Sequence, residues 1–291
     1  MARVFKRDTL YRTHLEEYSE TWQEFVKFRR ENGILEIRFH IDDGPWRWNE
    51  PMHGALVPMF ADVSHDPETE CIIITGTGDV FLNQFDPESL ARQSEQEFGQ
   101  HIAYDQWWAA QTRMPHALMD IRVPIVGAVN GPAVIHPEIA FLSDVVICTP
   151  NTHLWDRHYT GVGITPSDGG NIFFRELLGM NRARAFLYLG TKVEADQLLE
   201  LGLVAEVVEP ERLLERAWEI AETVFMSVTR IQRRLSREIL MQPWREVYMR
   251  EIRASMAMEC WACEDTWPGQ HPKAEGGLAP DPAKLSGIAG R

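Results

Sequence analysis

The chain has 291 residues, of which 44% are hydrophobic and 25% are charged, the ordinary composition of a globular protein. Its 43 acidic and 29 basic residues give a formal net charge of -14. An acidic protein repels phosphate backbones and anionic lipid, so this balance argues against nucleic-acid and membrane partners.

The predicted elements alternate between helix and strand in the first part of the chain. Helix-like spacing of apolar residues predicts an opening helix over Leu10–Arg30, and Ile34–Phe39 reads as a strand. A helix is predicted over His53–Val63. The short apolar run Cys71–Gly76 is typical of a strand buried on both faces. A long helix is then expected from Asp86 to Asp120.

The alternation continues to about residue 209. The remaining predicted elements are strands at Pro124–Val129, Val145–Cys148 and Leu203–Val208, and helices at Pro137–Leu142 and Gly169–Leu178. Beyond them the pattern is helical over Glu211–Phe225, Val228–Met241 and Glu246–Glu259. Strands alternating with helices predict an α/β fold. We therefore expect a core over residues 1–209, a helical region over 210–264 and a Pro/Gly-rich tail over 265–291.

The cysteines and the apolar runs bear on the cellular compartment. Cys71 and Cys148 lie in apolar runs like core thiols, and four scattered cysteines are too few for a disulfide framework. Cys260 and Cys263 form a lone C-x-x-C, whereas a zinc site needs four ligands. We interpret them as helix neighbours.

No apolar run approaches the roughly 20 residues that cross a bilayer, so a cytoplasmic protein is expected.

Three motifs follow the predicted strands. The first is T-G-T-G-D-V-F-L-N-Q-F-D at Thr75–Asp86. The second is I-V-G-A-V-N-G-P at Ile125–Pro132, leading to H-P-E-I at His136–Ile139. The third is His158 followed by I-T-P-S-D-G-G at Ile164–Gly170.

In order and spacing these motifs resemble the crotonase (enoyl-CoA hydratase/isomerase) superfamily over about residues 30–210. The resemblance implies a crotonase-type ββα spiral core with a C-terminal helical oligomerisation region. It also implies a homotrimer or a dimer of trimers.

Two departures from the family pattern bear on the substrate. In members that use coenzyme A, two backbone N–H groups form an oxyanion hole, one in an A-G-x-D segment and one in a G-G-G turn. Here these segments read Asn83-Gln84-Phe85-Asp86 and Ile135-His136-Pro137. Glycine lets a backbone approach a ligand closely, and proline cannot donate a hydrogen bond. A thioester of coenzyme A is therefore not the expected substrate.

The same departures resemble the β-diketone hydrolase branch of the superfamily. That branch has an H-P-E-I turn, a histidine in place of the second catalytic glutamate, and a P-x-D-G aspartate. These positions fall on His136, His158 and Asp168. The active-site tryptophan of the branch matches Trp48, which has a histidine five residues later (His53), as in the branch. The C-terminal glutamate of the branch matches Glu259.

This chain also departs from that branch. One extra residue separates His158 from Asp168, and Leu90 stands where the branch places a pocket phenylalanine.

The resemblance implies hydrolysis of a cyclic β-diketone by a retro-Claisen reaction, without a metal or other cofactor and with water as co-substrate. Histidine suits the base because its pKa lies near working pH. A carboxylate on the other ring nitrogen would fix its tautomer. We assign these two roles to His158 and Asp168. His136 and the indole of Trp48 would donate to the enolate oxygen.

The remaining candidates have less defined roles. Glu259 would orient a water or the second histidine, and Asn83 and Leu90 would line the substrate. Glu138 sits where hydratases keep a catalytic glutamate, and it is either a site residue or structural. Four further histidines, His53, His101, His116 and His153, have no constellation around them and are expected at the surface or in the core.

Alternatives remain open. His158 could cap a loop, Asp168 could be only a helix N-cap, and Trp48 could belong to the aromatic core. At the level of the whole protein, the rivals are a CoA-dependent enzyme with an altered oxyanion hole and an inactive crotonase-fold binding scaffold. The missing glycine pair counts against the first rival. The two histidines followed by an aspartate count against the second.

Overall fold

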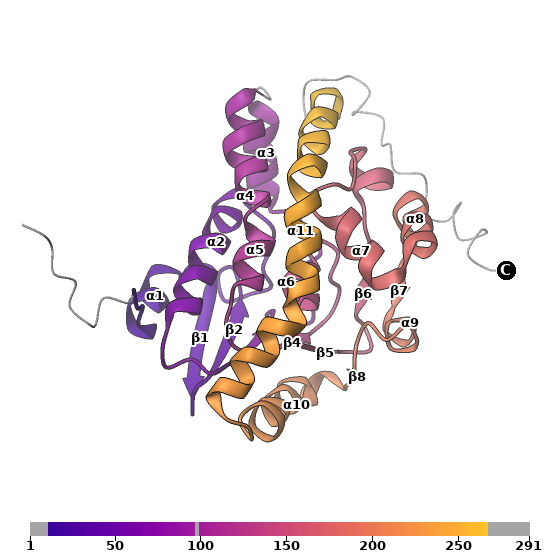
Figure 1. Cartoon of the computed structure of the whole chain (residues 1–291). Coiled ribbons are helices and arrows are strands. Elements are labelled where there is room, and N and C mark those ends of the chain that lie inside the picture. Colours follow the sequence, from indigo (N-terminus) through magenta and orange to yellow (C-terminus); the bar gives the residue numbers. More distant parts are fainter. Residues whose placement is uncertain (1–10, 97–98, 267–291) are drawn as a thin grey trace, which may run out of the picture.

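A six-stranded sheet forms the centre of the computed structural model, which describes residues 11–96 and 99–266 (Figure 1). The strand order is β1-β2-β3-β4-β5-β8, with β1 and β2 antiparallel and each later neighbour parallel. A second small sheet pairs β6 with β7. The strands are β1 (Val26–Glu31), β2 (Ile34–Phe39), β3 (Cys71–Thr75), β4 (Ile125–Val129), β5 (Val145–Cys148), β6 (His153–Leu154), β7 (Val193–Glu194) and β8 (Glu206–Val207).

Helices cover both faces of the sheet. The α-helices in the described part of the chain are α1 (Leu15–Thr21), α2 (Glu50–His65), α3 (Pro87–Glu95), α4 (Ala109–Gln111), α5 (Met114–Met119), α6 (Glu138–Phe141), α7 (Gly170–Leu178), α8 (Met180–Leu189), α9 (Ala195–Glu200), α10 (Leu213–Ile220) and α11 (Arg230–Thr266). The described residues also form helices of other types, namely the 3-10 helix Pro210–Arg212 and the π-helices Ile102–Trp108, His158–Val162 and Ala221–Phe225.

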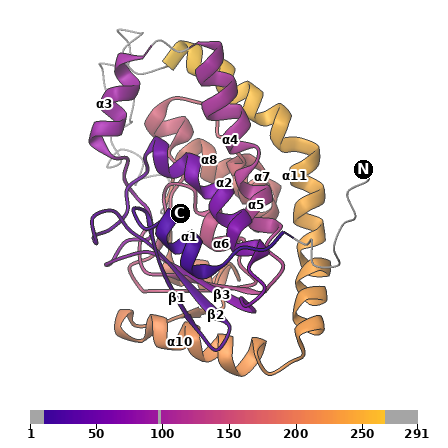
Figure 2. The ribbon, with the colours of Figure 1, turned by 90° about the vertical axis from the view of Figure 1, so that its left-hand side faces the viewer.

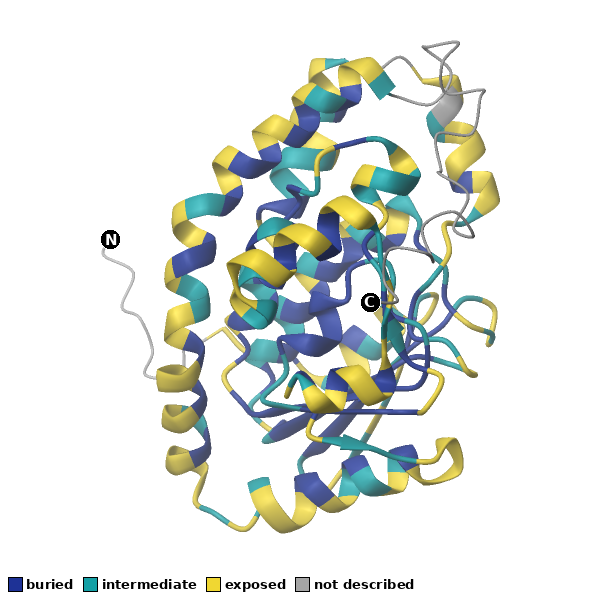
Figure 3. Cartoon of the chain, turned by 90° about the vertical axis from the view of Figure 1, so that its right-hand side faces the viewer, coloured by how far each residue is buried: buried dark blue, intermediate teal, exposed yellow. Residues whose placement is uncertain are grey.

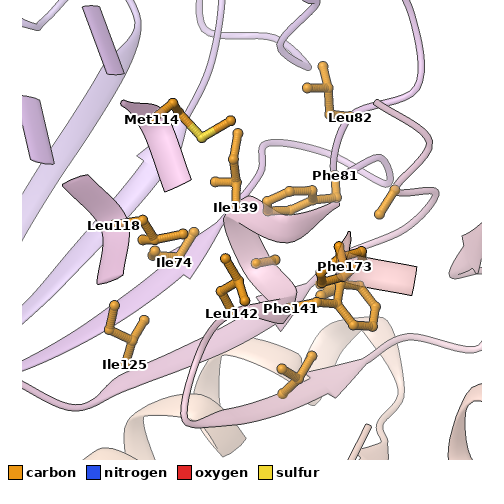
Figure 4. Packing of buried hydrophobic residues seen from close by; sticks show 14 of the residues in the cluster. Ile74, Phe81, Leu82, Met114, Leu118, Ile125, Ile139, Phe141, Leu142 and Phe173 are labelled. Carbon is orange, nitrogen blue, oxygen red and sulfur yellow. The ribbon is translucent and has the colours of Figure 1, made fainter. Parts of the chain in front are cut away.

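Burial of β3 on both faces, which its continuous apolar run predicted, is confirmed. Ile72 and Ile74 belong to the larger core, whereas Cys71 and Ile73 belong to a second cluster with α10. Successive side chains of a strand point to opposite faces, so one apolar strand serves both layers. Figure 2 shows α10 on one side of the sheet and helices such as α2 and α5 on the other. Figure 4 shows the larger core from within, where Ile74 lies near side chains of α5 and α6.

The predicted opening helix over Leu10–Arg30 is wrong. Helix α1 ends at Thr21, and Val26–Glu31 forms β1 instead. The reason is the turn that follows, because Asn32 and Gly33 have φ angles of 51° and 81°. Two residues in the left-handed region form the hairpin turn that matches strand twist, and this turn folds β1 back onto β2.

Two further helix boundaries differ from the predictions. The single helix expected over Asp86–Asp120 is wrong, because this segment divides into α3, a π-helix, α4 and α5. Pro87 and Pro115 lie at the first or second position of α3 and α5, where proline favours the start of a helix.

The two helices expected after residue 228 are instead one helix, α11, with Pro243 inside it. Its buried stripe faces the core while its opposite side is exposed (Figure 3), and this packing offsets the cost of the proline. Helix α11 includes the first two residues of the predicted tail, and residues 267–291 lie outside the described part. In the described ranges no helix is long and apolar enough to span a membrane.

A buried ion pair fixes α11 to the sheet. The guanidinium of Arg237 donates to the carboxylate of Asp144 and, at 2.7 Å, to the carbonyl of Ile121. Asp144 also accepts from the backbone N–H of Ile125 at 2.7 Å, where β4 begins. One carboxylate therefore links the long helix to the strand with which the second motif begins.

We predict that Asp144→Ala lowers the free energy of unfolding by about 3–5 kcal/mol, because it leaves the Arg237 charge buried without its partner. Urea denaturation followed by circular dichroism measures the change. The matched control is Asp105→Ala, which removes an exposed carboxylate and should change stability by no more than about 0.5 kcal/mol. Equal stability of the two variants would contradict the role given to Asp144.

Candidate active site

The loops that leave the carboxyl ends of β3 and β4 are tied together by Asn130. Its side-chain oxygen accepts from the N–H of Gly76 at 3.0 Å, and its amide nitrogen donates to the carbonyls of Gly78 and Val80 at 2.8 and 2.9 Å. At Gly131 an added Cβ would lie 1.8 Å from the carbonyl oxygen of Asp79, so only glycine fits. The N-G pair thus locks the first two motifs side by side at the edge where α/β sheets bind ligands.

His158 lies between two carboxylates. Its Nδ1 is 2.9 Å from Oδ2 of Asp156, and its Nε2 is 3.3 Å from Oδ2 of Asp168. The extra residue between His158 and Asp168 therefore does not separate them. The intervening chain begins with the π-helix His158–Val162, whose hydrogen bonds span five residues where those of an α-helix span four. Asp156 was not among the predicted site residues. It lies on Nδ1 of His158, whereas Asp168, the only carboxylate predicted to contact the ring, lies on Nε2.

Opposite charges dominate the protonation of this group. Burial lowers the pKa of His158, but the charges of Asp168 and Asp156 outweigh burial and raise that pKa well above its ordinary value. Burial likewise raises the pKa of Asp168, and the positive His158 more than reverses this effect. His158 and Asp168 thus form an imidazolium–carboxylate pair at neutral pH.

Glu259 reaches the same group from α11. It is 2% exposed, and its Oε2 accepts from the backbone N–H of Ser167 at 3.0 Å. Burial and then the charge of Asp168 raise the pKa of Glu259 to about 8. At neutral pH it is therefore mostly a protonated acid beside an ionised pair.

His158, Asp168 and Glu259 offer ligand atoms that all lie within 4.8 Å of one another. Two carboxylates and one imidazole can hold a divalent ion, provided that Glu259 first loses its proton.

A second group forms around His136. Its backbone has a φ angle of 45°, a left-handed conformation that non-glycine residues adopt at a cost. The ring is held on one side by Glu138, whose Oε1 lies 2.6 Å from Nδ1, and its centroid is 4.1 Å from that of Trp48. Burial lowers the pKa of His136, and Glu138 outweighs burial and raises it. The Nε2 atom lies 3.2 Å from the amide of buried Gln111, another residue that sequence reasoning missed.

The expectation that His53 lies apart from any constellation is wrong. Its ring centroid is 4.8 Å from that of Trp48 and 6.0 Å from that of His136. Burial, and then the positive charge of His136, lower the pKa of His53 to about 3, so it stays neutral. The five-residue spacing after Trp48 was the available signal.

The other three of the four histidines expected outside the site make contacts away from both groups or lie exposed. Nδ1 of His116 in α5 is 2.6 Å from the carbonyl of Thr112, which lies just before that helix, and Nδ1 of His153 lies 4.0 Å from Oε2 of Glu194. His101 is exposed.

Asn83 and Leu90 are not brought into either group by any hydrogen bond in the described ranges. Asn83 is half-buried and lies between Leu82, which pairs with the Ala133 segment, and Gln84, which pairs with Trp48. Leu90 lies on α3 and is 44% exposed.

The two groups face each other within reach of Coulomb interactions. The positive His136 lowers the pKa of Asp168, and Asp168 in turn raises that of His136. His136, with the Trp48 ring beside it, therefore lies within Coulomb reach of the group that consists of His158, Asp168 and Glu259. This arrangement can stabilise negative charge on one atom of a ligand while it moves protons at another.

Comparison with known proteins places this geometry in a family. Residues 29–265 match the family model for enoyl-CoA hydratase/isomerase. The chain belongs to this family. The predicted crotonase fold is confirmed, with a sheet that is parallel apart from β1 and with a long C-terminal helix.

Curated relatives include the crotonyl-CoA hydratase of Syntrophomonas wolfei, 30% identical over 218 residues that cover 71% of this chain and 78% of the relative. The short-chain-enoyl-CoA hydratase of Clostridium acetobutylicum is 29% identical over 167 residues. That match covers 57% of this chain and 62% of the relative, less than two thirds of its length.

Among solved structures, this chain resembles a beta-diketone hydrolase from the cyanobacterium Anabaena sp. PCC 7120 bound to (S)-3-oxocyclohexyl acetic acid. The two are 31% identical with a TM-score of 0.80, over 85% of this chain and 97% of that chain. The predicted resemblance to this branch is confirmed. An enoyl-CoA hydratase/isomerase from Mycobacterium paratuberculosis, 22% identical with a TM-score of 0.74 over 84% of this chain and 96% of that chain, shares the fold.

We predict that Asp156→Asn lowers the pKa of His158, because the negative charge and hydrogen bond at Nδ1 both favour the imidazolium. A pH titration of the His158 ring by NMR measures this shift directly. Glu194→Gln, beside the more distant His153, serves as the control and should leave His158 unchanged. An unaltered His158 titration in the Asp156 variant would exclude Asp156 as the partner that sets its charge.

Proposed function

We propose that this protein is a β-diketone hydrolase. It would break the bond between one carbonyl carbon and the carbon that separates the two carbonyls, by a retro-Claisen reaction, and release a keto acid. The observation that carries the proposal is His136. It stands, buried and with positive φ, in the turn where CoA-using relatives are expected to keep a glycine. His136 carries a side chain where glycine would let a ligand approach the backbone closely, and the next residue, Pro137, has no N–H to donate.

His136 and Trp48 suit the stabilisation of an enolate. When water attacks one carbonyl and the C–C bond breaks, the electron pair moves onto the oxygen of the other carbonyl. A protonated His136, held by Glu138, places a charged donor near that oxygen, and the adjacent Trp48 ring limits its movement. Loss of one such donor typically raises the barrier by about 3 kcal/mol.

His158 suits the activation of water. In its neutral form Nε2 can accept a proton from a water bound beside Asp168, while Asp156 keeps Nδ1 protonated and fixes the ring. The hydroxide equivalent adds to the carbonyl carbon, and collapse of this adduct gives the carboxylic acid and the enolate.

Glu259 suits the final proton transfer. A carboxyl group with a pKa of about 8 is an acid at neutral pH and can protonate the enolate carbon. The imidazolium of His158, which holds the proton taken from water, can then transfer that proton to the ionised Glu259. This transfer restores both groups and needs no cofactor.

The ligand of the Anabaena hydrolase supports a bicyclic substrate. Hydrolysis of bicyclo[2.2.2]octane-2,6-dione between a bridgehead carbon and a carbonyl gives 3-oxocyclohexyl acetic acid, the compound in that structure. We therefore extend the proposal to cyclic or bicyclic 1,3-diketones, for which this dione is the first probe.

A CoA-dependent hydratase is the second candidate, and the names of the curated relatives favour it. Hydration of crotonyl-CoA tests it directly.

An oligomer, as the family resemblance implied, stays a prediction. The exposed residues Ile231, Leu235 and Ile239, four positions apart on α11, give it an apolar row to bury.

We predict that His158→Ala lowers kcat for the bicyclic dione by at least about 10³-fold, because it removes the base and the centre of the ion pairs. The keto acid is measured by mass spectrometry in ¹⁸O-water, where one heavy oxygen should enter the new carboxyl group. His153→Ala is the matched control and should retain activity. Unchanged turnover by the His158 variant would rule out this mechanism.

The pH dependence follows from the two shifted groups. The reactive form needs neutral His158, whose raised pKa keeps it charged in mild acid, so kcat/KM should rise with pH. It also needs protonated Glu259, whose ionisation near pH 8 should lower the rate again. A bell-shaped profile with its maximum above pH 7 is expected. Glu259→Gln should lower kcat/KM because it removes the acid, and its residual activity should show no alkaline limb. A limb that persists in this variant would belong to another group.

A further inference from the structure

A cavity of about 410 Å³ opens at the opposite edge of the sheet from His158. Its walls come from residues 11–12, from residues 64–67 at the end of α2 and just beyond it, from Arg122 just before β4, and from the first two turns of α11. These are the amino ends of the strands, whereas His136 and His158 follow the carboxyl ends. The cavity is therefore separate from the proposed active site.

Four arginines line this cavity in a chain whose net charge is -14. They are Arg12, Arg122, Arg230 and Arg234. The lining also includes Asp66, but that carboxylate is already occupied. It pairs with Arg30 and accepts from the hydroxyls of Tyr18 at 2.8 Å and Thr69 at 3.0 Å.

The positive charge exceeds the carboxylates that balance it. One carboxylate, that of Glu70, is shared by Arg230, Arg233 and Arg234 at 3.1, 2.9 and 3.5 Å. Within residues 11–96 and 99–266, neither Arg12 nor Arg122 has an ion pair or hydrogen bond through its guanidinium.

The arginines also act on one another. Burial lowers the pKa of Arg234, and the positive charges of Arg230 and Arg122 lower it further although Glu70 opposes them. The buried Nε of Arg234 has no acceptor in the described part of the chain. A donor without an acceptor, inside a group of like charges, leaves a site that an anion would stabilise.

We propose that this cavity binds a phosphate group, either as inorganic phosphate or as part of a small phosphate ester. Guanidinium groups bind phosphate oxygens through paired, charge-assisted hydrogen bonds. A doubly charged anion balances the excess of arginines better than a single carboxylate does. Arg230 and Arg234 lie in the first two turns of α11, so the cavity is at the N-terminal end of this helix, where the helix dipole adds positive potential.

The test is isothermal titration calorimetry of the full chain at constant ionic strength, with inorganic phosphate, glycerol 3-phosphate and acetate as separate titrants. Saturable binding of at least one phosphate compound is expected, with acetate at least tenfold weaker. Whichever phosphate binds more tightly identifies the source. Arg12→Gln and Arg122→Gln should each raise Kd about tenfold.

Arg184→Gln is the matched control, because Arg184 is an exposed arginine on α8 and its removal changes the net charge equally. It should leave Kd within about twofold. Arg12 and Arg122 are themselves exposed, so circular dichroism should show folded variants. Absence of phosphate binding, equal binding of acetate, or equal Kd in all three variants would overturn the proposal. Diketone turnover does not enter this test, so the two proposals fail independently.

Discussion

The imidazole of His158, held between the buried carboxylates of Asp156 and Asp168, is the interaction on which the rest of the site depends. Two negative charges keep the ring charged despite its burial. The same negative charge acts on Glu259 from the other side and, together with burial, keeps that carboxyl protonated at neutral pH. An acid and a latent base thus coexist within one small group, which is what hydrolysis followed by protonation of carbon requires.

The fold brings these groups together from distant parts of the chain. Parallel strands deliver the loops that carry His136 and His158 to one edge of the sheet, and Asn130 fixes the neighbouring loops there. Helix α11 crosses the core and places Glu259 against the backbone of Ser167, while Arg237 and Asp144 hold the helix nearer its start. At the amino ends of the strands the same helix begins with the arginines of the phosphate cavity.

Much of this arrangement was accessible from the sequence, and the exceptions have physical reasons. The apolar run of β3 predicted its burial, and the order of the motifs predicted the family and the candidate residues. Gln111 was missed because its contact with His136, 25 residues away, is created by tertiary packing. Asp156 was missed although it lies only two residues before His158, because it stands outside the three motifs. The strand β1 was mistaken for a helix because its apolar residues also fit a helical period, and the turn at Asn32 and Gly33 decided between them. The π-helix that begins at His158 accommodates the extra residue between His158 and Asp168. From the spacing alone, this residue could have kept the two side chains apart.

The central claim is that side chains at the two glycine positions of the oxyanion hole change the substrate from an acyl-CoA to a free diketone. The most direct measurement compares kcat/KM for bicyclo[2.2.2]octane-2,6-dione and for crotonyl-CoA with the same preparation. Our account predicts hydrolysis of the dione to the keto acid and no hydration of crotonyl-CoA above background. Efficient hydration of crotonyl-CoA, with the dione left intact, would contradict it.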